Sequence, residues 1–386
     1  MFLIHNMENF MENQKVNYNG RIKKVQNRLK EKTYNAFLVC NADNRYYLTG
    51  FFADDQFMNE ISGYLFITKN KVLLATDSRY VLQAKEQTQG VEIVCVNDLP
   101  EKFVPEILKK MEIQSLGFES NRISVELHNK LQRSILDQNL LVQLVPDPNF
   151  VGNDRNVKEE GELLAIQKSL HIAEQAFLRM LNAIHPRMTE KEIAWQLETE
   201  IRQGGADSLS FDIIVASGPN AALPHAIPTD RIVGEKTPIL FDWGARLNGY
   251  CSDTSRTIVF GTPEKDFIDA FNTLVETQKM ATYEIVSGNK TKEIAQKAND
   301  FLEKRGYKET KYAHGLGHGV GLAIHEMPTL SLIRENTLEE NNVVTVEPGI
   351  YIPNQWGIRL ENMVVAKKER PQILNQLPVQ YDMIRV

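Results

Sequence analysis

The chain has 386 residues, of which 42% are hydrophobic and 24% charged, so it has the composition of a globular protein and the length of about two domains. Its formal net charge of −6, with both signs interspersed, argues against a nucleic-acid-binding protein, and no apolar run reaches the roughly 18 residues of a membrane span. Three cysteines without a CxxC pair, and a start, MFLI, too short for a signal peptide, predict reduced thiols and a cytoplasmic location.

The N-terminal part of the chain predicts a tail followed by an α/β domain. Residues 1–19 are polar and rich in asparagine and methionine, which indicates a flexible tail. Within residues 20–150, RIKKVQNRLKEK has helical spacing, AFLVC is a short apolar strand, and YLFIT with KVLLAT indicates a hairpin around KN. VEIVCV and SLGFE add strands, and the domain is expected to end near LVPDPNF, whose prolines form a linker with the following GNDRN.

The C-terminal part, residues 155–386, predicts an α+β domain with an internal duplication. Two helices, KEEGELLAIQKSLHIAEQAFLRMLNAI and TEKEIAWQLETEIRQGG, precede a strand-rich region, and the same order of elements starts again after Pro263. The tetrapeptide KEIA opens the second helix of each half, at 191–194 and 292–295. FDWG and VEPG each end a strand, also in the same order, which favours a duplicated helix-helix-β unit.

The first strand region places two aspartates on one face of a hairpin. Asn248-Gly249 is a strong signal for a two-residue turn. Reflection about that turn pairs Asp242 with Ser255, and Asp253 then lies on the same face as Asp242, at a diagonal position.

The second half repeats this arrangement with Glu347 and Glu361 around a Pro-Asn-Gln loop. A single acid on a strand is usually a surface residue, but these four interrupt buried-looking strands such as PILF, VVTV and MVVA. Buried like charges raise one another's pKa, and only Arg256 and Arg359 lie nearby to balance them. Two divalent cations would balance four carboxylates charge for charge.

The segment HGLGHGVGLAIHE, residues 314–326, supplies histidines to the same centre. Its glycines predict neither a helix nor a packed strand, which argues against a zinc-binding HExxH helix even though His314 and His318 are four residues apart. Glycines let the backbone run close to a bulky neighbour, so we expect His318 to bind metal, whereas His325 is either structural or catalytic. One imidazole with four carboxylates suits Mn²⁺ or Co²⁺.

These motifs resemble those of the pita-bread dinuclear metallopeptidases, which include aminopeptidase P, prolidase and methionine aminopeptidase; creatinase shares the fold without metal. The matching pieces are FDWGARLNGYCSDTSRT, HGLGHGVGLAIHE, VEPGIY and GIRLEN, between about residues 155 and 370. Residues 20–150, with RYYLTGF and ATDSRYVLQA, resemble the creatinase-like N-terminal domain, which methionine aminopeptidases lack. The resemblance therefore implies an α/β creatinase-like domain followed by an α+β pita-bread catalytic domain.

The resemblance also assigns five metal ligands by position. It implies that Asp242 chelates one ion and that Asp253 and Glu361 bridge both ions. His318 and Glu347 would complete the other site. We expect two divalent ions, Mn²⁺ first, with Co²⁺ or Zn²⁺ as alternatives.

Five further residues match catalytic or pocket positions of the family. His225, in NAALPHA, and His325 match histidines that contact substrate and stabilise the tetrahedral intermediate. His314 and Arg359 match positions behind the ligands, and Tyr351 matches a residue that lines the pocket.

Two positions depart from the family pattern. Asn362 stands where an Asp commonly follows the bridging Glu, which weakens a charge behind the site rather than the site itself. Thr329 stands where several prolidase-like members carry Arg, so an anchor for a substrate carboxylate is in doubt.

The activity implied by the resemblance is that of an Xaa-Pro aminopeptidase, which releases the first residue of peptides with proline in second position. A hydroxide held between two metals would attack the scissile carbonyl, and Glu347 would pass a proton to the leaving nitrogen. The expected partners are a peptide substrate and at least a second copy of the chain, with no nucleic acid and no membrane.

Four alternatives stay open at this point. An Xaa-Pro dipeptidase shares all five ligands and differs here only through Thr329. The ligands disfavour a creatinase-like C–N hydrolase, and the extra domain disfavours a methionine aminopeptidase. A non-catalytic pita-bread peptide-binding module would typically have lost ligands, whereas this chain keeps all five.

Overall fold

The computed structural model describes residues 16–53, 55, 57 and 59–379, so most of the predicted tail lies outside the described residues. The tail prediction extended too far at its end, because helix α2 already begins at Tyr18. The side chain of Asn17 caps this helix by accepting a hydrogen bond from the backbone N–H of Gly20. The chain divides into two compact units, Met1–Arg155 and Asn156–Val386.

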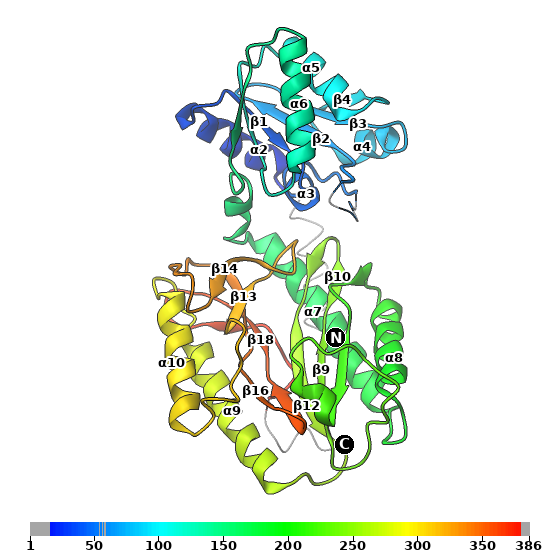
Figure 1. Ribbon diagram of the computed structural model, residues 1–386, viewed down its shortest axis with the longest axis vertical. Helices are drawn as coiled ribbons and strands as arrows, with labels where there is room; N and C mark the ends of the chain where they lie inside the picture. The colour runs from blue at the N-terminus through cyan, green and yellow to red at the C-terminus, as the bar shows by residue number, and fades with distance from the viewer. Residues whose placement is uncertain (1–15, 54, 56, 58, 380–386) are drawn as a thin grey trace. The chain divides into compact units, whose positions relative to one another are not determined.

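The first unit is built on a six-stranded sheet with the strand order β4-β3-β2-β1-β5-β6 (Figure 1). Its strands are β1 (Ala36–Val39), β2 (Tyr64–Thr68), β3 (Val72–Thr76), β4 (Glu92–Cys95), β5 (Ser115–Phe118) and β6 (Gln143–Pro146). Its helices are α2 (Tyr18–Arg28), α3 (Ala42–Thr49), α4 (Val81–Gln87), α5 (Pro100–Lys110) and α6 (Val125–Asp137), with 3₁₀ turns η1 (Leu29–Glu31) and η2 (Gly152–Arg155).

Strand pairing in this sheet follows the apolar patterns of the sequence. β2 and β3 form the predicted antiparallel hairpin, whereas β1 with β5, β5 with β6 and β3 with β4 are parallel. Helices α5 and α6 pack on one face of the sheet, where Leu108 and Leu131 join Leu38 in one buried cluster. The linker prediction placed Pro146 outside the sheet, but it is the last residue of β6 and pairs with Phe118.

The second unit, as far as the structure describes it, contains four helices and the remaining strands. The helices are α7 (Glu160–Leu181), α8 (Glu190–Gln203), α9 (Lys265–Tyr283) and α10 (Thr291–Lys304). The strands of the first half are β7 (Ser208–Leu209), β8 (Ile214–Ser217), β9 (Pro238–Trp243), β10 (Ala245–Leu247), β11 (Tyr250–Cys251) and β12 (Thr254–Val259), with the 3₁₀ turn η3 (Gly218–Ala222) after β8. The strands of the second half are β13 (Gly317–Gly319), β14 (Glu326–Leu330), β15 (Val343–Val346), β16 (Gly349–Ile352), β17 (Trp356–Arg359), β18 (Asn362–Val365) and β19 (Gln372–Ile373).

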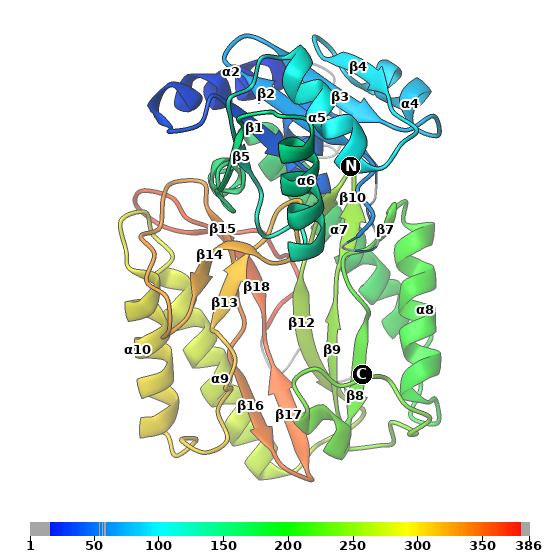
Figure 2. The ribbon, with the colours of Figure 1, turned by 45° about the horizontal axis from the view of Figure 1, so that its top comes forward.

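These strands form small sheets that lie between the helices. The sheets have the orders β12-β9-β8, β11-β10-β7, β14-β13-β15-β18-β19 and β16-β17. Figure 2 shows α8 beside the strands of the first half, and α9 and α10 beside those of the second. Helices α8 and α10 each have 14 residues and start 101 positions apart, at Glu190 and Thr291.

One apolar cluster joins the two halves of this unit. It contains Phe241 and Trp243 from the first half and Phe271, Leu316 and Val364 from the second. The ring of Trp243 stacks on that of Phe177, and its Nε1–H donates to a backbone oxygen of α7, so this tryptophan is a core residue.

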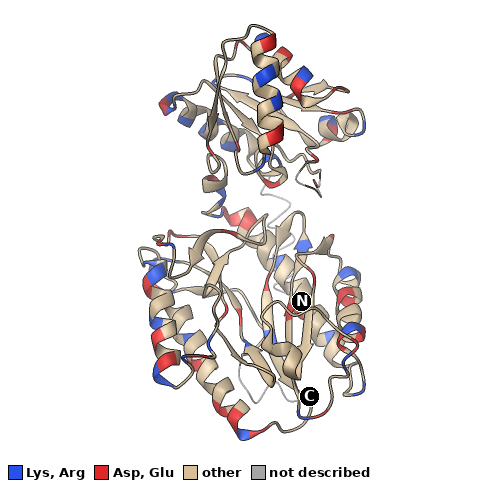
Figure 3. Cartoon of the chain, in the orientation of Figure 1, with Lys and Arg blue, Asp and Glu red and all other residues tan. Residues whose placement is uncertain are grey.

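Charged residues gather on the helices of this unit and are few on its strands (Figure 3). Acidic side chains on or beside the strands of this unit are therefore few. Among the described residues, no helix combines the length and apolar character needed to cross a membrane.

Candidate metal centre

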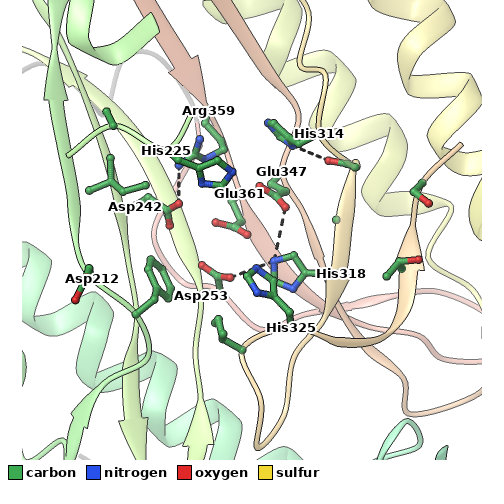
Figure 4. Close-up of a pocket in the computed structure, with 18 of the residues that line it drawn as sticks. Asp212, His225, Asp242, Asp253, His314, His318, His325, Glu347, Arg359 and Glu361 are labelled. Atoms are coloured by element: carbon green, nitrogen blue, oxygen red, sulfur yellow. Dashed lines mark hydrogen bonds and ion pairs between the residues drawn. The ribbon is translucent and has the colours of Figure 1, made fainter. Parts of the chain in front are cut away.

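Two aspartates of the predicted site lie on the hairpin that joins β9 to β12. Asn248 and Gly249 have φ angles of 50° and 80°, as the two central residues of a type I′ turn require. The ladder pairs Asp242 with Ser255, which confirms the predicted register. Asp253 comes two residues before Ser255, and Figure 4 shows both aspartates directed into the same space.

Two glutamates come from the second half in the same way. Glu347 follows β15 and Glu361 precedes β18. Val346 pairs with Asn362 on one side of them, and β16 pairs with β17 on the other side. The common register places Glu347 opposite Glu361, so all four predicted acids reach one centre (Figure 4).

The glycine-rich segment forms a strand, which corrects the prediction that no packed strand would form there. β13 lies between β14 and β15 and contains a register irregularity. A Cβ atom on Gly317 would lie 2.0 Å from the carbonyl oxygen of Thr345, so glycine is what permits two backbones to pack this closely. The strand directs His318 toward the acids (Figure 4).

The donor atoms of three residues from different elements converge closely. One ligand atom each from Asp253, His318 and Glu361 lies within 4.8 Å of the other two. His318 Nε2 is 3.5 Å from Asp253 Oδ2 and 3.7 Å from Glu347 Oε1. These separations let a cation between the side chains contact several of them.

The second nitrogen of His318 indicates which tautomer is present. Nδ1 lies 3.1 Å from the carbonyl oxygen of Gly319, where it can only donate. The lone pair of Nε2 then faces Asp253 and Glu347, which is the arrangement of a metal-binding imidazole.

Burial and mutual repulsion disfavour charge on the acids. Burial, followed by the neighbouring Glu361, Asp242 and Glu347, raises the pKa of Asp253 well above its ordinary value. Burial and Glu361 do the same to the pKa of Glu347. Burial and Asp242 raise the pKa of Glu361 to about 8. Without a compensating cation, these acids therefore hold protons at pH values where carboxyl groups are normally charged.

The histidines are shifted toward their neutral forms. Burial lowers the pKa of His318 to about 4 and the pKa of His314 to about 4. Burial also lowers the pKa of His325, whose ring contacts that of His318 with centroids 4.3 Å apart. Neutral imidazoles can bind a metal or donate one hydrogen bond, which both suit the predicted roles.

The set of side chains fits divalent cations on three observations. Oδ1 of Asp242 is buried and has no hydrogen-bond partner among the described residues. Burial and the neighbouring acids disfavour charge on Asp253, and the imidazole lone pair of His318 points at this carboxyl group. Four carboxylates with one imidazole form an oxygen-rich site of the kind that Mn²⁺ or Co²⁺ accepts.

Arg359 connects the acids to residues behind them. Its Nη2 donates to Asp242 Oδ2 at 2.5 Å, and its Nη1 donates to the hydroxyl oxygen of Tyr351 at 2.9 Å. That hydroxyl lies 3.2 Å from His314 Nε2. The Nε of Arg359 donates to Ser255 Oγ, which in turn donates to Glu361 Oε2 at 2.8 Å. One guanidinium therefore orients acids from both halves.

The acids and histidines line a cavity of about 760 Å³. Nine of the ten predicted site residues border it: His225, Asp242, Asp253, His314, His318, His325, Glu347, Arg359 and Glu361. Tyr351, predicted to line the pocket, is not among the bordering residues. It is buried behind Arg359 and His314, because its hydroxyl bridges these two side chains.

Two contacts of β12 at the site were not predicted from the sequence. Ser255 was identified only as a pairing partner, yet its hydroxyl links Arg359 to Glu361. Arg256 donates from Nη2 to Asn362 Oδ1 at 2.9 Å, so the asparagine still accepts the hydrogen bond that an aspartate would. A hydroxyl and an arginine inside a buried strand, TSRT, were the signal available in the sequence.

Comparison with known proteins relates both units to described families. Residues 165–368 match metallopeptidase family M24, and residues 21–147 match the creatinase/prolidase N-terminal domain. An Xaa-Pro dipeptidase of Pyrococcus horikoshii is 31% identical over 91% of this chain and 95% of its own.

Two solved structures resemble the whole chain closely. An Xaa-Pro dipeptidase from Bacillus anthracis has a TM-score of 0.87 and 32% identity, and covers 95% of this chain and 99% of its own. An X-Pro aminopeptidase from Thermotoga maritima MSB8 has a TM-score of 0.84 and 33% identity, and covers 93% and 98%. Two of these three relatives are named Xaa-Pro dipeptidase, and the third is named X-Pro aminopeptidase.

Proposed function

Because the chain belongs to metallopeptidase family M24, we propose that it is a dinuclear metal-dependent Xaa-Pro aminopeptidase, which releases the first residue of peptides with proline in second position. The predicted family and fold class, a creatinase-like domain followed by a pita-bread catalytic domain, are confirmed. The observation that carries the proposal is the convergence of four acids and His318 in one cavity.

Five side chains would hold the two ions. Asp242, together with Asp253 and Glu361 from different hairpins, would hold the ions. His318 and Glu347 would complete the set of ligands, in keeping with the distance of 3.7 Å between His318 Nε2 and Glu347 Oε1. When bound, the ions would polarise the scissile carbonyl and make a water molecule acidic.

The remaining residues would bind the peptide and move protons. His225 and His325 border the cavity and can donate hydrogen bonds to the carbonyl oxygen as it gains negative charge. Glu347 borders the cavity beside His318, so its carboxylate could take up a proton from the attacking water and pass it to the leaving nitrogen. Arg359 and His314 would keep Asp242 and Tyr351 in place.

The shape and lining of the cavity suit a short peptide. Its volume lies within the usual range of small-ligand sites. Phe211, Ile214 and Ile324 form an apolar part of the wall, against which a proline ring can pack. The free amino group of the substrate would lie near the acids, which restricts cleavage to the ends of chains.

A second candidate function, an Xaa-Pro dipeptidase, is favoured by one side chain. Arg334 borders the same cavity, and among the described residues its guanidinium has no hydrogen bond or ion pair. A free guanidinium could bind the carboxylate of a two-residue substrate, although Thr329 replaces the arginine of other members.

The decisive experiment compares substrates that differ only in length. Release of the first residue is measured from Xaa-Pro, its C-terminal amide and Xaa-Pro-Yaa, with Mn²⁺ and after chelation. Metal-dependent cleavage of the amide and the tripeptide supports the aminopeptidase, whereas cleavage of Xaa-Pro alone supports the dipeptidase. Cleavage of none, together with peptide binding, would favour a non-catalytic module. The Glu361→Gln variant serves as the inactive control.

Assembly and location are further parts of the proposal. We expect at least a homodimer, because in the resembling family the N-terminal domain of a neighbouring subunit helps to close the site. Light scattering on purified protein tests this. The cytoplasmic location stays a prediction from the composition of the chain.

A further inference from the structure

A fully buried carboxylate at the start of α8 holds the loop that carries His225. Glu190 has no exposed surface. Its Oε1 accepts hydrogen bonds from the backbone N–H of Ser217 at 2.6 Å and from the Ser217 hydroxyl at 2.9 Å. Its Oε2 accepts from Asn220 Nδ2 at 2.8 Å, and from the N–H and hydroxyl of Thr229 at 2.9 and 2.6 Å.

These donors lie at both ends of one loop. Ser217 ends β8, and Thr229 lies four residues after His225, so a single side chain fastens both stems of the segment 217–229. Backbone bonds add to this, since the N–H of Glu190 donates to Arg231 O and that of Lys191 donates to Thr229 O. The ends of the loop are therefore attached to the first turn of α8.

The opposite side of the loop rests on the catalytic centre. Arg359 Nη1 donates to the carbonyl oxygen of Pro224 at 2.9 Å, directly before His225. A Cβ atom on Gly357 would lie 1.9 Å from the carbonyl oxygen of Ala221, so β17 and this loop pack backbone against backbone. The loop is held between Glu190 and the residues that orient the acids.

From this arrangement we propose that Glu190 is a positioning residue for His225, whose imidazole it places over the cavity by fixing both stems of the loop. The inference rests on the proposed function, in which His225 contacts the reacting carbonyl. A misplacement of about 1 Å at such a group can lower the rate about a hundredfold.

The hydrogen bonds that Glu190 accepts from both stems of the loop require a carboxylate. Two carboxylate oxygens offer about four lone-pair directions to the donors, whereas a glutamine would turn two N–H groups toward them. Among the described residues Glu190 has no ion pair with lysine or arginine. Its charge is balanced by N–H and O–H dipoles and by its place in the first turn of α8.

The second half of the duplicated domain contains a similar attachment of a loop to the start of a helix, through one side-chain hydrogen bond. The residue 101 positions after Glu190 is Thr291, whose Oγ1 accepts from the N–H of Asn336 at 3.0 Å. Asn336 ends the loop that carries Ser331 and Arg334 to the other side of the cavity. Each second helix therefore begins with a buried residue that fastens a loop of the cavity rim.

The test uses the full-length, Mn²⁺-loaded protein and a double-mutant cycle. Glu190→Gln, His225→Ala and the double variant are compared for kcat and KM on Xaa-Pro-Yaa. Amide hydrogen exchange of residues 217–229 is measured in the metal-free proteins. Glu119→Gln is the matched control, because Glu119 is also fully buried and accepts from two backbone N–H groups and Asn44, but in the first unit.

We expect Glu190→Gln to lower kcat about tenfold or more, with a smaller change in KM, and to add little in the His225→Ala background. Exchange of residues 217–229 should become at least about tenfold faster. The Glu119→Gln control should leave kcat and this exchange unchanged. An undiminished loss in the His225→Ala background, or unchanged exchange, would overturn the inference.

A milder pair of variants serves if Glu190→Gln does not fold. Thr229 is exposed, so Thr229→Val removes only the hydroxyl that donates to Glu190, and Thr229→Ser retains it. We expect a loss of kcat and faster exchange with valine, and recovery with serine; equal behaviour of the two would overturn the inference. If the wild-type protein cleaves no peptide, the proposed function fails, and the exchange comparison alone decides whether Glu190 holds the loop.

Discussion

Nη2 of Arg359 lies 2.5 Å from Oδ2 of Asp242, although the two residues belong to different halves of the duplicated domain. The arginine occupies one oxygen of this carboxylate and leaves the other, Oδ1, buried and without a hydrogen-bond partner in the described part of the chain. The ion pair thus fixes the direction in which Asp242 can offer its free oxygen. The same guanidinium orients Ser255, which bonds to Glu361.

Shortening this arginine should weaken metal binding. Arg359→Lys retains one positive charge but cannot donate to Asp242, Tyr351 and Ser255 together. We expect Mn²⁺ affinity, measured by calorimetric titration, to fall about 10- to 100-fold, as for other residues that orient metal ligands. Arg202→Lys, at an exposed pair with Glu198, is the control and should have no effect.

The stability of the metal-free protein should fall as the pH rises from about 6.5 to about 8. Burial and Asp242 raise the pKa of Glu361 from 4.5 to about 8, so the folded state holds this proton more tightly than the unfolded chain. That stabilisation is complete below pH 4.5 and disappears as the pH passes about 8. Each such group changes the free energy of unfolding by at most about 1.4 kcal/mol per pH unit.

The histidines act in the opposite direction but at lower pH. Burial lowers the pKa of His318 from 6.5 to about 4, so the unfolded chain binds this proton more readily than the folded protein does. This difference opposes folding only below about pH 6.5. Above that value the acids determine how stability changes with pH. The measurement compares the melting temperatures of the wild type and the Glu361→Gln variant over this pH range. The variant should show the shallower decrease, and Mn²⁺ should raise the melting temperature of the wild type more at higher pH. Parallel curves for the two proteins would contradict this.

Adding a single methyl group to β13 should disrupt the centre. In Gly317→Ala the new Cβ would lie 2.0 Å from a backbone oxygen, and neither backbone can move without displacing His318 or β15. We expect a loss of about 1–3 kcal/mol or more in the free energy of unfolding, and weaker Mn²⁺ binding. The control is Gly152→Ala, where no atom lies within 4 Å of the new Cβ.

Removing the free guanidinium at the cavity should distinguish the two candidate activities. If Arg334 binds a substrate carboxylate, Arg334→Ala should raise KM about tenfold or more for Xaa-Pro and leave the C-terminal amide unaffected. An equal change for both substrates would mean that the side chain does not recognise the carboxylate. Steady-state kinetics on the two peptides provides the measurement.

The sequence predicted the parts of the centre that depend on local geometry. A two-residue turn at Asn248-Gly249 determines the register of its hairpin, so the pairing of Asp242 with Ser255 followed from counting residues. The alternation of side chains along strands then placed Asp253 on the same face. Burial of like charges predicted the need for cations without any knowledge of the distances.

Parts of the centre that depend on contacts between distant segments could not be predicted. β13 was missed because glycine disfavours strands locally, and only the neighbouring Thr345 backbone reveals why Gly317 is needed. Glu190 has the sequence signature of an ordinary acid in the first turn of a helix. Its burial arises from the path of residues 217–229, which no local pattern specifies.

The attachment of each rim loop to a helix start has a consequence for how the protein can change. Thr189 forms a bridge with Ile232, and Lys290 forms one with Thr337, again 101 positions along the chain. Between the fixed points of the second half, residues of the loop that carries Ser331 and Arg334 can be exchanged without altering the hairpins that carry the acids. Natural divergence or laboratory selection can therefore reshape this side of the cavity rim, whereas the loop of the first half must keep His225 in place.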